Sequence, residues 1–202
     1  NVLENDQKFW QLYQTYRVTI NEIVVNDNSM LTNMKFLFNF PGLLSFKRRI
    51  YYFKDQLKSI INYDKNIPVI IHRDNIFLES FDNLHQLDPY EIKRKIQITF
   101  LGENGLDYGG LTREWFTLIV QEIFKENNKL SIRTDNNNYQ PNPNSNEIEN
   151  HLEKFKFVGI IIALAIINSQ YVNAHFTRSF YKQILNFSIN FRDLEDYDET
   201  LY

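Results

Sequence analysis

The stretch that decides the fold is Leu101–Phe116, which reads LGENGLDYGGLTREWF. The run before it, Ile96–Leu101, alternates between apolar and polar residues, as a half-buried β-strand does. The run after it, Leu111–Phe124, repeats its apolar residues at the spacing of an amphipathic helix. Four glycines between Gly102 and Gly110 allow positive φ and close approach of the backbone. We therefore predict a strand, a tight turn and a helix.

A glycine-rich turn before a helix can also hold a phosphate group at the helix N-terminus. Here the spacing is neither that of a dinucleotide-binding turn nor that of a P-loop, and no Lys-Ser/Thr pair follows. Glu103 and Asp107 would also repel an anion. We therefore expect a structural turn in which these two acids cap neighbouring amides, and we expect no cofactor.

The rest of the chain is predicted to be mostly helical. Four further segments have helical spacing: Ser45–Ile61, Ile76–Leu87, His151–Asn168 and Thr177–Leu185. Asp88–Glu91 has the pattern of a helix start with a capping box. Pro68–Ile71 is expected to be a short strand, and the polar Asp135–Asn150 to be largely loop. Helices with a few short strands and no internal repeat indicate the α+β class.

Composition excludes several classes of function. The 202 residues are 43% hydrophobic and 15% aromatic, and their net charge of −3 argues against a nucleic-acid partner. The longest apolar run, Phe157–Ile167, is too short to span a membrane and indicates a buried helix. Cysteine is absent and the histidines lack metal-ligand spacing, so no metal site is expected. The absence of cysteine is compatible with an intracellular location, in the cytoplasm or the nucleus.

The stretch Leu101–Phe116 resembles the hallmark segment of the HECT ubiquitin-protein ligases. Further blocks occur in the order found in that family: Arg73–Phe81, Asn142–Ser145, His151–Gly159, His175–Lys182 and Asp193–Glu195. Upstream, Gln7–Phe9 and Lys47-Arg48 with Tyr52-Phe53 are similar to the Mule-type subgroup. The resemblance covers nearly the whole chain.

The resemblance implies an incomplete N-terminal lobe of a catalytic domain with two lobes. Residues 1–63 would form a helical N-terminal extension and residues 64–202 the first part of the N-lobe, with the catalytic C-lobe absent. The parent enzyme would take ubiquitin from a conjugating enzyme as a cysteine thioester and transfer it to lysines of protein substrates. The conjugating enzyme would bind mostly through residues beyond Tyr202. This chain has no cysteine and therefore no catalytic residue, so alone it is expected to be inactive.

The resemblance also implies roles for particular residues. Those shaping the hallmark turn are Gly105, Asp107, Gly109, Gly110, Arg113 and Glu114. We expect Arg113 and Glu114 to form a buried pair that fixes the following helix. Phe81 and Phe176 would bind ubiquitin without a covalent bond, and the alternative is that both rings belong to the core. Ile160 stands where the family commonly has arginine, so a polar contact there is expected to be lost or replaced by packing.

A second interpretation is a non-catalytic module, from a truncated product, that binds ubiquitin or another partner without transferring anything. The reading frame beyond Tyr202 would distinguish the two. A continuation that ends near a cysteine favours the enzyme, and an early stop favours the module.

Overall fold

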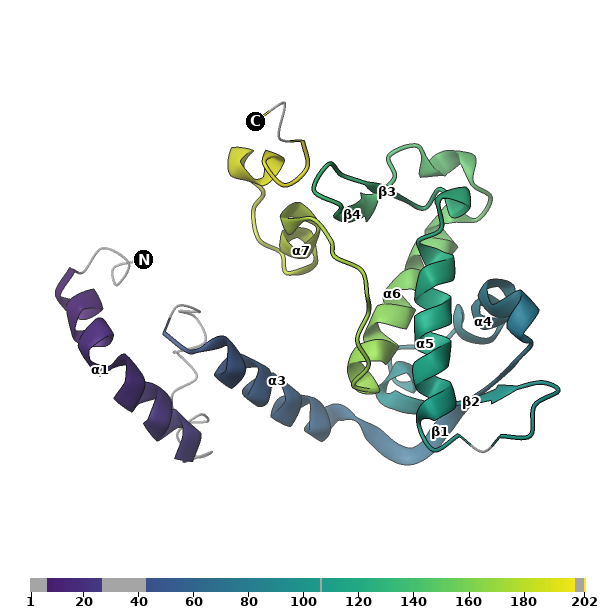
Figure 1. The fold of residues 1–202 in the computed structure, drawn as a ribbon, viewed down its shortest axis with the longest axis horizontal. Coiled ribbons are helices and arrows are strands. Elements are labelled where there is room, and N and C mark those ends of the chain that lie inside the picture. The colour runs from purple at the N-terminus through teal and green to yellow at the C-terminus, as the bar shows by residue number, and fades with distance from the viewer. Residues whose placement is uncertain (1–6, 27–42, 106, 199–201) are drawn as a thin grey trace. The chain divides into compact units, whose positions relative to one another are not determined.

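The computed structural model describes residues 7–26, 43–105, 107–198 and 202 (Figure 1). Its contacts divide the chain into two compact units, Asn1–Ile60 and Ile61–Tyr202. Among the described helices, none combines the length and the apolar character needed to cross a membrane.

The first unit contains two helices, α1 (Gln7–Asn26) and α3 (Phe46–Ile60). Two hydrogen bonds connect α1 to the segment that leads into α3. The hydroxyl of Tyr13 donates to the carbonyl of Leu43 at 2.8 Å, and the side chain of Asn21 accepts from the amide of Ser45 at 3.0 Å. The helix predicted from Ser45 onwards is confirmed, because α3 begins at the next residue.

The second unit holds the remaining elements. They are β1 (Asn62–Ile71), α4 (Ile76–Leu84), β2 (Arg94–Phe100), α5 (Gly110–Ile123), β3 (Ser131–Arg133), β4 (Tyr139–Pro141), α6 (His151–Ile167) and α7 (Arg178–Ile184). Short 3₁₀ turns connect several of them. The prediction of a mostly helical α+β fold with a few short strands is confirmed.

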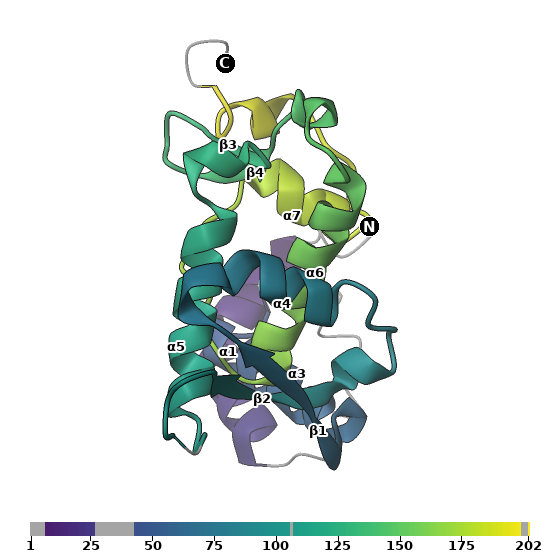
Figure 2. The ribbon, with the colours of Figure 1, turned by 90° about the vertical axis from the view of Figure 1, so that its right-hand side faces the viewer.

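β1 and β2 form a parallel two-stranded sheet, with α4 between them along the chain (Figure 2). Alternate residues of β2 are buried, so one face of the sheet packs on the core. The outer edge of β2 is closed by side chains. Asn168 accepts from the amide of Ile96 at 3.2 Å, and Asp107 accepts from the amide of Ile98 at 3.0 Å. Two backbone donors at this edge are therefore satisfied without a third strand.

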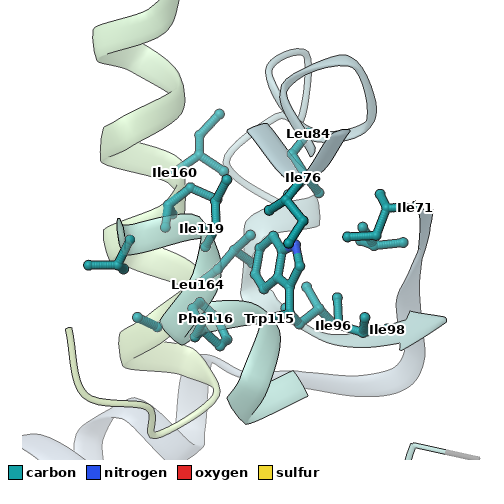
Figure 3. Packing of buried hydrophobic residues seen from close by; sticks show 14 of the residues in the cluster. Ile71, Ile76, Leu84, Ile96, Ile98, Trp115, Phe116, Ile119, Ile160 and Leu164 are labelled. Carbon is teal, nitrogen blue, oxygen red and sulfur yellow. The ribbon is translucent and has the colours of Figure 1, made fainter. Parts of the chain in front are cut away.

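The core lies between this sheet and helices α4, α5 and α6. Trp115 of α5 is fully buried at its centre, among side chains from β2, α4 and α6 (Figure 3). Its indole nitrogen donates to the hydroxyl of Ser80 on α4 at 3.0 Å, which satisfies a polar atom that burial would otherwise leave unpaired. Truncating a buried tryptophan to alanine costs about 3–5 kcal/mol.

A small hairpin continues from the end of α5. β3 and β4 pair antiparallel, with Arg133 opposite Tyr139. Tyr139 also meets the segment before α7, because its amide donates to the carbonyl of His175 at 2.6 Å and its carbonyl accepts from the amide of Thr177 at 3.1 Å. These bonds connect the hairpin to the start of α7. β4 ends at Pro141, which has no amide hydrogen with which to continue a ladder.

Three sequence-based boundaries differ from the structure. β1 begins at Asn62 rather than at Pro68, because β2 pairs with Asn62 as well as with Ile67–Ile71, and the register shifts between these two regions. The capping box forms, with Glu91 donating to Asp88 and accepting from it in return, but it starts only the 3₁₀ turn Glu91–Lys93. β4 lies inside the segment Asp135–Asn150 that was expected to be a loop.

Candidate functional site

The hallmark turn leads from the end of β2 to the start of α5. Gly102 and Gly109 have φ angles of 84° and 100°, in the region that strains residues with a side chain. Gly110 is the first residue of α5. A Cβ added to Gly105 would touch the side chain of Leu111 at 3.4 Å. The glycines at 102 and 109 are thus the ones that the backbone of the turn requires.

The carboxylate of Asp107 is the hub of the turn. One oxygen accepts from the amide of Gly109 at 2.8 Å and from the amide of Thr112 at 3.3 Å. The other accepts from the amide of Ile98 at 3.0 Å and from the hydroxyl of Thr112. The expectation that acids cap neighbouring amides is confirmed for Asp107, which joins the strand, the turn and the helix.

The environment of Asp107 favours its ionised form. Partial burial by itself would raise the pKa of Asp107, but the hydrogen bonds from Thr112, Ile98 and Gly109 outweigh it and hold the pKa below its ordinary value. The carboxylate is therefore charged at neutral pH and acts only as an acceptor.

Arg73 lies beside the turn and binds two carboxylates at once. Its guanidinium donates through two nitrogens to Glu103, with Nη2 at 3.0 Å from Oε2. It also donates to both oxygens of Glu114, at 2.7 and 3.1 Å. The same guanidinium lies over the ring of Phe100, 4.0 Å from its centroid. Glu103 was expected to cap amides; that expectation is wrong, since its carboxylate is engaged by Arg73.

Arg73 and the two carboxylates stabilise each other's charged forms, although Glu103 repels Glu114. Hydrogen bonds to Glu103 and Glu114 raise the pKa of Arg73 above its ordinary value. Hydrogen bonds from Arg73 lower the pKa of both carboxyl groups. All three side chains are more than a third exposed, so each pair alone adds little stability. Each carboxylate nevertheless accepts two hydrogen bonds from the guanidinium, and such paired bonds add geometric specificity.

The expected buried pair of Arg113 and Glu114 does not form. Both residues are exposed, and Glu114 binds Arg73 instead. Adjacent residues on a helix point in different directions, so a direct pair between them is disfavoured. Arg113 contributes its backbone, since its amide donates to the carbonyl of Gly109 at 3.2 Å at the start of α5.

Comparisons with known proteins place this geometry in a family. A model of the HECT-domain (ubiquitin-transferase) family matches residues 117–202. E3 ubiquitin-protein ligase HUWE1 of Mus musculus is 36% identical over 97% of the chain. UPL2 of Arabidopsis thaliana and TOM1 of Saccharomyces cerevisiae, also E3 ubiquitin-protein ligases, are each 31% identical, over 99% and 96% of the chain. The chain belongs to the HECT family.

The resemblance predicted from the sequence, to the HECT ligases and their Mule-type members, is thus confirmed. The chain spans only a small part of these relatives, 5% of HUWE1 and 6% of UPL2 and of TOM1. The family model begins at Thr117, immediately after the hallmark stretch. Support for the turn within the HECT family therefore comes from the relatives, whose similarity covers almost the whole chain.

Phe81, one of the two predicted ubiquitin-binding residues of this HECT chain, lies half-buried on α4. Its ring stacks on His85, with centroids 4.5 Å apart, and meets the edge of Phe157 at 5.4 Å. It packs on the core without being enclosed by it. One part of the ring is therefore structural and another part is accessible.

Phe176 is also half-buried, and its neighbours are other aromatic rings. It stacks on Phe180 at 4.5 Å and contacts Phe124 and Tyr181 at 5.7 and 5.9 Å. Phe176 is flanked by His175 and Thr177, which hydrogen-bond to Tyr139. The structure gives Phe81 and Phe176 separate sets of neighbours, so it does not bring the two rings together into one cluster.

Two further expectations concern packing and metal binding. Ile160 is buried in the core cluster, so its side chain packs on apolar neighbours. Over the part of the chain that the structure describes, no group of three or more His, Asp or Glu residues could hold a metal ion.

Proposed function

We propose that this chain is the scaffold lobe of a HECT-type ubiquitin-protein ligase. The parent enzyme would accept ubiquitin from a conjugating enzyme and transfer it to lysines of protein substrates. The observation that carries the proposal is the similarity of almost the whole chain to ligases of this family. The turn around Asp107 supports a scaffolding role, since this carboxylate binds backbone amides of the strand and of the turn.

The chemistry would require a residue that this chain does not contain. A cysteine thiolate attacks the thioester carbonyl of the charged conjugating enzyme, forms a new thioester and releases the first thiolate. The amine of a lysine then attacks the second thioester, and an amide bond replaces the carbon–sulfur bond. With no cysteine in the chain, the nucleophile would lie in a C-lobe elsewhere in the parent protein.

A charging assay tests this proposal. The chain is incubated with activating enzyme, conjugating enzyme, ubiquitin and ATP, and the products are separated with and without reductant. We expect no reductant-sensitive ubiquitin adduct on this chain, and one on a parent protein that includes the C-lobe. An adduct on the chain alone, or none on the longer protein, would contradict the proposal.

We also propose how the chain divides within the parent. Residues 1–63 would form the helical extension and residues 64–202 the first part of the N-lobe, with the conjugating enzyme bound mainly beyond Tyr202. An intracellular location, cytoplasmic or nuclear, fits this role. The division of contacts between Ile60 and Ile61 lies near the proposed boundary.

Non-covalent ubiquitin binding through Phe81 and Phe176 is a finer part of the proposal. Each ring is half-buried, so each is held by its neighbours and still offers apolar area to a partner. Rigid aromatic rings suit such contacts because they lose little conformational entropy on binding.

NMR titration of labelled ubiquitin with the chain tests this binding. We expect the unmodified chain to change the chemical shifts of ubiquitin, and we expect weaker changes with Phe81→Ala and with Phe176→Ala. Tyr171→Ala is the matched control, since Tyr171 is an aromatic residue that is 93% exposed. If the unmodified chain leaves the ubiquitin spectrum unchanged, the binding proposal fails while the transferase assignment is unaffected.

A further inference from the structure

A hollow of about 650 Å³ lies between the end of α5 and the hairpin of β3 and β4. Its lining includes the rings of Phe124 and Tyr139 and three cationic residues, Lys125, Lys129 and Arg133. A neighbouring hollow of about 460 Å³ shares Phe124, Lys125, Arg133 and Tyr139 with it. The two hollows therefore form one continuous surface, here named the cationic hollow.

Positive charge is concentrated here, although the whole chain has a net charge of −3. Glu126 is the one acid that lines the first hollow, and the second has none. Lys125 is paired with Glu122 at 2.5 Å. Within the described residues, Lys129 and Arg133 have no carboxylate at ion-pair distance. Two cations at the hollow are thus available to an external anion.

The surroundings hold these groups in place. Arg133 faces Tyr139 across the hairpin, and its guanidinium lies 5.1 Å from the centroid of that ring. The ring of Tyr139 packs on Phe124 at 4.4 Å. Lys129 has a φ of 49°, and its carbonyl accepts from the side chain of Asn142 at 2.7 Å. Pre-organised charges and rings cost less entropy when a ligand binds.

We propose that the cationic hollow binds an acidic peptide segment of a partner protein. Carboxylates of the segment pair with Lys129 and Arg133, and an apolar side chain between them packs on Phe124 and Tyr139. Arginine beside aromatic rings is the composition of energetically dominant protein–protein contacts. Nucleic acid is the disfavoured ligand, because the chain as a whole is acidic and would repel a phosphate backbone.

Fluorescence anisotropy with the full chain tests the proposal. The probe is a labelled peptide of alternating glutamate and phenylalanine, and the reference is the same peptide with glutamine for glutamate. We expect the acidic peptide alone to bind, with affinity falling as salt is raised. The double variant Lys129→Gln/Arg133→Gln is expected to weaken binding about tenfold, or 1.4 kcal/mol.

The matched control is Lys65→Gln/Lys93→Gln, which removes the same charge at two exposed lysines outside the hollow. Its binding is expected to change less than about twofold. Three results would overturn the proposal: no binding of the acidic peptide, equal losses in the two double variants, or tighter binding of a single-stranded RNA than of the peptide. Melting temperatures equal to that of the parent chain show that each variant is folded. None of these outcomes bears on ubiquitin transfer.

Discussion

At the scale of the residue, the carboxylate of Asp107 connects the segments that meet at the hallmark turn. Asp107 accepts from an amide of β2, from an amide of the turn and from two groups of Thr112 in α5. No other side chain among the described residues bonds to all three. Its loss would leave the amide of Ile98, on the free edge of the sheet, without an acceptor.

We predict that Asp107→Ala lowers the free energy of unfolding by about 2 kcal/mol, because it leaves partly buried donors unpaired. Urea denaturation followed by circular dichroism measures the change. Asp82→Ala is the control, since Asp82 is an exposed acid of α4, and its effect should stay within about 0.5 kcal/mol. If the Asp107 variant is as stable as the unmodified chain, water replaces the carboxylate as the hydrogen-bond acceptor.

The network of Arg73 predicts a dependence of stability on pH. The pKa values of Glu103 and Glu114 are lowered in the folded chain by hydrogen bonds from Arg73. Their contribution is therefore complete above the ordinary pKa of glutamate, about 4.3, and is lost as pH falls through the lowered values. Stability should decline on acidification in that window.

We predict that Arg73→Met makes this decline shallower between about pH 5 and pH 3. Without hydrogen bonds from Arg73, the pKa values of Glu103 and Glu114 are no longer lowered by folding. Arg94→Met is the control, since Arg94 forms a cation–π contact with Tyr90 but no ion pair with any carboxylate that the structure describes. Unfolding curves at a series of pH values measure the slopes. If stability falls with pH equally steeply in the unmodified chain and in the Arg73 variant, the network of Arg73 is not the cause of the decline.

At the scale of the element, α7 is a helix of seven residues that depends on its ends. The hydroxyl of Thr177 accepts from the amide of Phe180 at 3.3 Å and caps the N-terminus. Near the other end, Lys182 donates to the buried carboxylate of Asp193 at 2.8 Å. Hydrogen bonds from Lys182 and from the amide of Asn190 lower the pKa of Asp193.

Replacing the cap with Thr177→Ala is predicted to cost about 1 kcal/mol. Thr177→Ser keeps the capping oxygen and should cost clearly less. Hydrogen exchange at the amides of α7 is the most direct measurement, since the helix should open more often when its cap is missing. Equal exchange in the alanine and serine variants would mean that packing, rather than the cap, holds the helix.

At the scale of the whole molecule, the principal core lies entirely within one unit. Every buried residue of that cluster falls between Ile67 and Ala165, inside the second unit Ile61–Tyr202. None of the residues that the structure describes in the first unit belongs to it. The second unit therefore holds the apolar contacts that a cooperative fold requires.

We accordingly predict that a chain of residues 61–202 folds by itself and unfolds cooperatively. Trp115 is its only tryptophan, and its burial should give a blue-shifted emission that moves to longer wavelength in denaturant. Emission already typical of water-exposed tryptophan, with no transition in denaturant, would contradict independent folding. The full chain, which also carries Trp10, serves as the reference.

The sequence by itself determined the class of fold, most of the helices and the family. The apolar residues that indicate α5 and α6 lie close together in the sequence, so they can be recognised without knowledge of the tertiary structure. The acid at position 107, set among glycines between a strand and a helix, likewise indicated a capped turn. The start of β1 and the hairpin of β3 and β4 could not be predicted, because their strands depend on partners elsewhere in the chain.

Only the tertiary structure decided how the site is assembled. Arg73 is 30 residues from Glu103 and 41 from Glu114 in the chain, and no local pattern pairs them. They meet because β1 and β2 run parallel, which brings the C-terminal ends of both strands to the same end of the sheet. The half-burial of Phe81 and of Phe176 likewise depends on rings distant in the chain, Phe157 for the first and Phe124 for the second. Periodicity acts over a few residues, whereas ion pairs and burial depend on which distant segments become neighbours.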